Sequence, residues 1–184
     1  MRSPRFLVLI LSAIFVVACG GGGNQPSSIT WRNVEMELPE GWYVFEEAED
    51  RLSISNQDIG VGDDPDVPRE LPEGDTVAMF FTYEPGTFPD DWRRFVEQQD
   101  ATLESDDQIV LQGEVPATRL IFSFVTDGIP TREMVVVIPS RSIVLLAQPV
   151  PGPGEDDAPE VFLEYIEDFL GVLESAEFGA PVLD

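Results

Sequence analysis

The only cysteine of the chain has the most distinctive chemistry, and its surroundings limit what that chemistry can be. Cys19 follows an apolar run from Phe6 to Val17, and the small residues Ala18 and Gly20 flank it. A single cysteine cannot form an internal disulfide, so the folded part must rely on its core. The run of about 12 residues, preceded by two arginines, is too short to span a bilayer of about 30 Å and has the length of a signal-peptide core.

The segment Val16-Val17-Ala18-Cys19 resembles the lipobox of bacterial lipoprotein precursors. The resemblance implies cleavage before Cys19, a diacylglyceryl thioether on its sulfur and an amide-linked chain such as palmitate. Two or more acyl chains give stable anchoring, whereas one gives marginal binding. The alternatives are a plain secretory signal with a chance cysteine, or a buried helix. The expected location is the extracytoplasmic face of a bacterial cell membrane, with the lipid as the membrane contact.

Four segments follow from this reading. Residues 1–18 are the expected signal peptide, and residues 19–28 the lipidated cysteine with a Gly-rich polar tether. Residues 29–178 form the expected domain, and residues 179–184 a tail. A flexible Gly-rich tether of about nine residues has an r.m.s. reach of roughly 16 Å, enough to hold a domain just clear of the lipid headgroups.

The composition is strongly acidic, with 35 aspartates and glutamates against 10 arginines and a formal net charge of −25. Removal of Arg2 and Arg5 with the signal makes the charge −27. Such a body is repelled by nucleic acid and by anionic membrane surfaces, which excludes a nucleic-acid binder. The remaining partner classes are cations, basic protein patches and neutral polymers. An adaptation of the surface to salt or acid explains the acidity equally well and needs no specific partner. Twelve phenylalanines supply a core and argue against disorder.

Missing residue types exclude most enzyme chemistries. The chain has no histidine and no lysine, so it has no Ser-His-Asp triad, imidazole ligand, Schiff base or Ser-Lys pair. A lipidated Cys19 provides neither a thiol nucleophile nor a thiolate ligand for zinc. Two carboxylate chemistries remain, which are a glycosidase-like hydrolase with paired acids and metal binding through oxygen ligands.

The irregular stretch from Gly60 to Asp75 has the highest density of acidic residues in the chain. Its functional interpretation is a site for a cation. The candidate calcium ligands are Asp63, Asp64, Asp66, Glu70 and Asp75. The stretch departs from the EF-hand pattern, because Pro65 and Pro68 interrupt it and the sixth position holds no glycine. The alternative is a solvated surface loop, and no other cofactor is expected.

Hydrophobic periodicity predicts an α+β fold, an antiparallel sheet flanked by helices. The predicted strands are 30–38, 42–46, 51–55, 77–83, 108–113, 117–126, 131–138 and 142–148. The last three form an antiparallel meander, with a tight turn at Asp127-Gly128. A helix is predicted for 87–99 and a long amphipathic helix around 161–173, with sheet packing as its expected role.

Arg93 and Arg94 are the only adjacent cations after the signal. They could bind an acidic partner, but the surrounding acids favour pairing within the chain.

The order of elements resembles the PsbP-like family, an α/β/α sandwich. The motifs that carry the resemblance are Leu38-Pro-Glu-Gly-Trp42, Gly113-Glu-Val-Pro-Ala-Thr-Arg119, Arg141-Ser-Ile-Val-Leu-Leu-Ala147 and Val172-Leu-Glu-Ser175. The resemblance covers residues 29–178 and implies a binding or assembly module, usually without catalysis. The members serve unrelated partners, so the fold transfers no particular function.

The sequence therefore favours a lipid-anchored binding or accessory protein of the cell envelope, without catalytic activity and with an envelope protein as a possible partner. A calcium-binding or calcium-stabilised module is the first alternative. A small carboxylate-dependent hydrolase is the second, and it requires two carboxylates about 5 to 10 Å apart, one with a raised pKa.

Overall fold

The computed structural model describes residues 27–59, 74–126, 128–150 and 158–179. Its strands are β1 (Ser28–Trp31), β2 (Val34–Glu37), β3 (Tyr43–Glu47), β4 (Arg51–Ser55), β5 (Val77–Tyr83), β6 (Thr102–Leu111), β7 (Val115–Thr126), β8 (Ile129–Ile138), β9 (Ile143–Pro149) and β10 (Glu177–Phe178). Its helices are α1 (Pro89–Gln98), α2 (Ala158–Glu164) and α3 (Ile166–Ser175), with short 3₁₀ turns at η1 (Gln112–Glu114) and η2 (Pro139–Arg141). None of the helices in these ranges is both long and apolar enough to cross a membrane.

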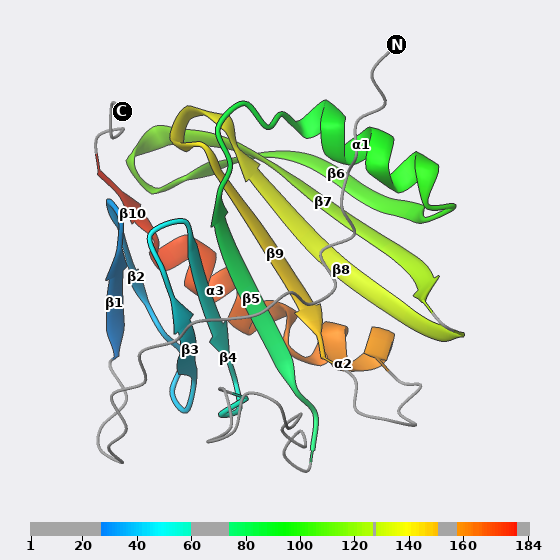
Figure 1. Ribbon diagram of the computed structural model, residues 1–184, viewed down its shortest axis with the longest axis horizontal. Helices are drawn as coiled ribbons and strands as arrows, with labels where there is room; N and C mark the ends of the chain where they lie inside the picture. The colour runs from blue at the N-terminus through cyan, green and yellow to red at the C-terminus, as the bar shows by residue number, and fades with distance from the viewer. Residues whose placement is uncertain (1–26, 60–73, 127, 151–157, 180–184) are drawn as a thin grey trace.

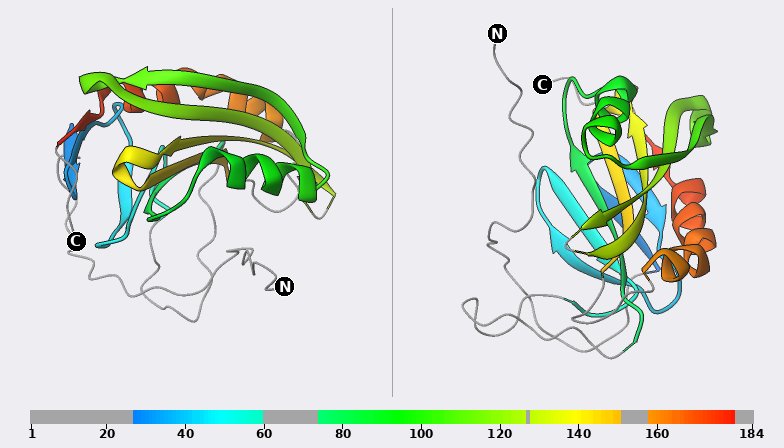
Figure 2. Two further views of the ribbon diagram at one scale, coloured as in Figure 1. Left: turned by 90° about the horizontal axis from the view of Figure 1, so that it is seen from above. Right: turned by 90° about the vertical axis from the view of Figure 1, so that its right-hand side faces the viewer.

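Two antiparallel sheets form the framework (Figure 1). The large sheet has seven strands in the order β3-β4-β5-β9-β8-β7-β6, and the small sheet has three in the order β1-β2-β10. Helices lie on both sides of the large sheet, with α1 on one side and the α2–α3 pair on the other (Figure 2). The predicted α+β class with an antiparallel sheet and flanking helices is therefore confirmed, as is the meander of β7, β8 and β9.

The middle of β8 shows how the large sheet serves two cores. Residues Met134 to Ile138 are all fully buried, although successive side chains of a strand point to opposite faces. Met134, Val136 and Ile138 enter the larger core under α2 and α3, which includes Phe162 and Phe169. The two residues between them enter a smaller core under α1. A run of apolar residues without alternation is what a strand buried on both faces requires.

Aromatic side chains join the small sheet to the rest of the domain. The indole N–H of Trp31 donates to the carbonyl of Ala48, with an N–O distance of 2.8 Å. The ring of Trp31 also contacts that of Phe81 on β5, with ring centroids 6.5 Å apart. The small sheet thus closes one end of the larger core.

Three element predictions were wrong in detail. The strand predicted for 30–38 is a hairpin of β1 and β2, because Arg32 adopts a left-handed φ of 53° and reverses the chain. The long helix predicted around 161–173 is divided near Tyr165, whose φ and ψ of −96° and 3° depart from helical values. The strand predicted at 108–113 is the much longer β6, which begins at Thr102. β10 was not predicted.

The core under α2 and α3 provides a matched stability test. Leu173→Ala, at a side chain that is 2% exposed, should lower the free energy of unfolding by about 2–5 kcal/mol, because the cavity is enclosed. Leu163→Ala, the same change at a side chain 54% exposed, should change it by less than about 0.5 kcal/mol. Urea denaturation of both variants measures the difference, and equal effects would contradict this packing.

Candidate binding surface on the large sheet

The site residues predicted from sequence fall mostly outside the described residues. Cys19, Asp63, Asp64, Asp66 and Glu70 all lie in undescribed parts of the chain, so their roles stay predictions. Asp75 is described, and its backbone carbonyl accepts hydrogen bonds from the side-chain amides of Asn56 and Gln57, at 2.9 and 3.1 Å. Among the described residues, no three acidic or cysteine side chains are grouped closely enough to hold a metal ion together.

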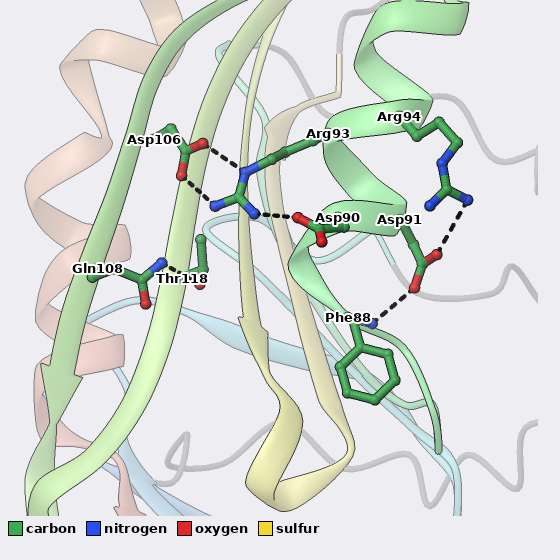
Figure 3. Close-up of polar contacts among 8 residues, drawn as sticks. All are labelled: Phe88, Asp90, Asp91, Arg93, Arg94, Asp106, Gln108 and Thr118. Atoms are coloured by element: carbon green, nitrogen blue, oxygen red, sulfur yellow. Dashed lines mark hydrogen bonds and ion pairs between the residues drawn. The ribbon is translucent and has the colours of Figure 1, made fainter.

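Helix α1 is attached to the sheet by few apolar contacts. Pro89 is its first residue, and the carboxylate of Asp91 accepts a hydrogen bond of 3.0 Å from the backbone N–H of Phe88 (Figure 3). Proline and acidic residues suit a first turn, because the N–H groups there lack helical partners and the dipole is positive. Only Val96 of the helix is fully buried. Its attachment must therefore depend on polar contacts as well.

Arg93 provides that polar attachment (Figure 3). Its Nε and Nη2 donate to the two carboxylate oxygens of Asp106 on β6, at 2.7 and 2.8 Å, and its Nη1 donates to Asp90 at 2.7 Å. The hydrogen bonds from Arg93 hold the pKa of Asp106 below its usual value. A bidentate arginine–carboxylate pair fixes the relative orientation of the two side chains as well as their distance. The pair thus sets the position of α1 over β6.

Arg94 pairs within the helix, with Nη1 3.6 Å from the carboxylate of Asp91. The prediction that Arg93 and Arg94 pair with nearby acids is therefore confirmed. Arginines elsewhere on the domain are paired in the same way: Arg51 with Glu46, Arg119 with Asp107 and Arg132 with Glu104.

The two arginine pairs of α1 allow a direct comparison. Double-mutant cycles with Arg93→Gln and Asp106→Asn should give a coupling energy of about 1 kcal/mol in low salt, because the geometry is two-pronged and joins two elements. The cycle with Arg94→Gln and Asp91→Asn should give a coupling near zero, since that exposed pair has one long contact. Chemical denaturation at low and high salt measures both couplings, and equal values would contradict the assigned role of Arg93.

Glu133 is a partly buried carboxylate on the large sheet. It lies on β8 opposite Phe122 of β7, on the α1 side of the sheet and two residues before the buried Val135. Its carboxyl has no hydrogen bond or ion pair with any described residue, and burial raises its pKa from the usual 4.5 to about 7. Desolvation disfavours the charged form of an acid, and nothing here offsets that effect. Near neutral pH this carboxyl can therefore either donate or accept a hydrogen bond.

Other polar side chains share the face and the level of Glu133. Ser55 on β4 pairs with Ala78 on β5, which pairs with Gln148 on β9. Met134 of β8 pairs with Ala147 of β9 in an antiparallel ladder. The next position along this ladder places Gln148 beside Glu133. Thr76, two residues before Ala78 and therefore on the same face, is buried, and its hydroxyl has no partner in the described part of the chain. This polar level thus comprises Ser55 on β4, Gln148 on β9 and Glu133 on β8, with the apolar Ala78 between them on β5 and Thr76 next to it.

Partly exposed apolar side chains flank this polar level. Phe45 and Phe80 contact edge to face with centroids 6.0 Å apart, while Phe124 stacks on Phe122 with centroids 5.8 Å apart. Leu146 pairs with Phe80 on one side and Val135 on the other, so it lies between the two aromatic pairs. The "carboxyl face" denotes these partly exposed residues together, namely Phe45, Phe80, Phe124, Glu133, Leu146 and Gln148.

Sequence reasoning missed Glu133. The signal was a single acid on the strand predicted for 131–138, which was otherwise hydrophobic at its centre. Strand alternation places the neighbouring Arg132 on the opposite face. The pattern could not show that Arg132 pairs there with Glu104, or that no arginine of the described residues pairs with Glu133.

The comparisons with known proteins find distant structural likenesses. No family model matches the sequence, and no curated protein matches it. A Pseudomonas aeruginosa protein of unknown function, PA94, whose description suggests a regulator, aligns with a TM-score of 0.48 at 13% identity, over 84% of this chain and 97% of its own. A structure from Bacteroides thetaiotaomicron aligns with a TM-score of 0.41 at 13% identity, over 80% of this chain and 45% of its own. These values assign neither a family nor an activity.

The raised pKa of Glu133 has a measurable effect on stability. From about pH 4.5 to about pH 7 the unfolded chain releases this proton while the folded chain retains it. The free energy of unfolding therefore falls as pH rises through that window. Glu133→Gln removes this contribution and should be more stable than wild type by about 1–2 kcal/mol at pH 8, with little difference at pH 4.

Denaturation midpoints between pH 4 and pH 8 test this expectation. Glu97→Gln, on the exposed side of α1, serves as the control with the same change of charge. A Glu133→Gln variant with the wild-type pH dependence would show that the carboxyl is not desolvated.

Proposed function

We propose that this chain is a lipid-anchored binding or accessory protein of the bacterial cell envelope, with a PsbP-like α/β/α domain and no catalytic activity of its own. The observation that carries the proposal is the position of Cys19. It ends an apolar run of signal-peptide length and precedes a short Gly-rich segment, and the first strand starts at Ser28. Cleavage before Cys19 would leave the lipid and the domain joined by about nine residues, with the domain held close to the membrane.

The residue inventory supports binding over catalysis. The chain has no histidine or lysine, and lipidation would consume its one thiol. Carboxylates are the groups left for acid–base chemistry, and Glu133 has the raised pKa that the hydrolase alternative needs. A hydrolase also needs a second carboxylate about 5–10 Å away. The positions around Glu133 on its face of the sheet hold Thr131, Val135, Phe122 and Gln148, none of which is an acid.

The arrangement of elements supports the family resemblance. An antiparallel sheet with α1 on one side and α2–α3 on the other has the three layers that the resemblance implies. In an accessory protein such a sheet supplies a rigid surface, and the carboxyl face is the part that its own helices leave partly exposed.

Replacement of the lipidation site tests the anchor. In a bacterial host, the wild-type protein should sediment with membranes and gain lipid mass, while Cys19→Ser should stay unprocessed or appear in the soluble fraction. Gly22→Ser, a change within the tether that preserves Cys19, should behave like wild type. Fractionation and intact-mass measurement report both properties, and a soluble wild-type protein without lipid mass would overturn the proposal.

A further inference from the structure

The carboxyl face borders the core under α1, and two of its members, Phe124 and Leu146, pack against that core. The residues that α1 helps to bury include Leu120, Phe122 and Val137, around Val96. The carboxyl face continues from this core toward β3, where Phe45 contacts Phe80. From β3 to β7 there are five strand spacings of about 4.8 Å, so the face is roughly 24 Å wide. That width suits a segment of protein chain.

The acidic group of this face has no counter-charge among the described residues. Glu133 has no cationic partner among the described residues, although an ion pair would offset its desolvation. The arginines on the same side of the sheet are engaged elsewhere, Arg93 with Asp90 and Asp106, and Arg51 with Glu46. No arginine in the described ranges pairs with Glu133, so a basic group of a partner molecule would meet a carboxyl that is unpaired within those ranges.

We propose that the carboxyl face docks a segment of a partner protein that presents apolar side chains around one lysine or arginine, with the basic group paired to Glu133. The proposal rests on the proposed binding function and names the chemistry of the partner. Lysine and arginine carry long aliphatic stems that pack on apolar surfaces while the charged end reaches a carboxylate. Phe80 and Phe124 offer apolar contact for such stems and for neighbouring side chains. The formal net charge, −27 without Arg2 and Arg5, steers a basic segment toward this domain in preference to an acidic one.

The test uses the mature chain from residue 19 with Cys19→Ser, which needs no lipid or detergent. The probes are two synthetic amphipathic helical peptides of 14 residues, one with a single lysine at the centre of a leucine face and one with norleucine in its place. Amide chemical shifts locate the contact, and titrations give the affinities. The lysine peptide should bind about tenfold more tightly than its twin, which corresponds to about 1.4 kcal/mol for the pair. It should shift the signals of residues 78–80, 131–135 and 146–148.

Glu133→Gln should remove the preference for lysine, while Glu97→Gln, with the same change of charge on the exposed side of α1, should retain it. Equal affinity of the two peptides for wild type would overturn the proposal, as would shifts confined to the α2–α3 side. Those wild-type results do not depend on whether any variant folds. A negative result would also leave the fractionation of Cys19→Ser unaffected, so the anchor and the docking face are tested separately.

Discussion

The central strands of the large sheet must serve two cores at once, and the rest of the domain depends on this constraint. β8 and β9 are buried on both faces, so a shift of register by one residue would exchange the side chains of the two cores. Phe162 and Phe169 fill one core from α2 and α3, while Val96 reaches the other from α1. The two cores differ in size, so only one register of β8 and β9 places the right side chains in each core. The same register sets which face each helix packs against.

The two sides of the sheet are covered by different means. On one side, α2, α3 and the small sheet supply large apolar side chains to one core, among them Trp31, Phe162 and Phe169. On the other side, α1 supplies little buried surface and is positioned by the Arg93–Asp106 pair. A buried apolar contact is insensitive to salt, whereas an ion pair near the surface is screened. The α2–α3 side of the large sheet is therefore closely packed. On the other side α1 covers the sheet only in part, and Glu133 stays partly accessible.

Local patterns in the sequence were enough for most of the fold. The hydrophobic runs predicted the meander, and the helix predicted for 87–99 contains α1. The reversal at Arg32 was missed because its left-handed backbone is dictated by contacts far away in sequence. Arg32 donates to the carbonyl of Glu49 and lies 3.7 Å from the ring centre of Tyr83. The division near Tyr165 was missed because apolar spacing continues across it. Glu133 was missed for a related reason, since the lack of a partner is a property of the assembled sheet.

β6 is one of the two edge strands of the large sheet, and its sequence disfavours pairing with a further strand. It is ten residues long, and its register shifts between Leu103 and Ser105. Carboxylates at Glu104, Asp106 and Asp107 follow along the same stretch, each already paired with an arginine of its own chain. Irregular, charged edges resist pairing with a second sheet. In the proposed location on a membrane surface, where encounters between copies are frequent, such an edge would keep neighbouring domains separate and leave their broad faces free for other contacts.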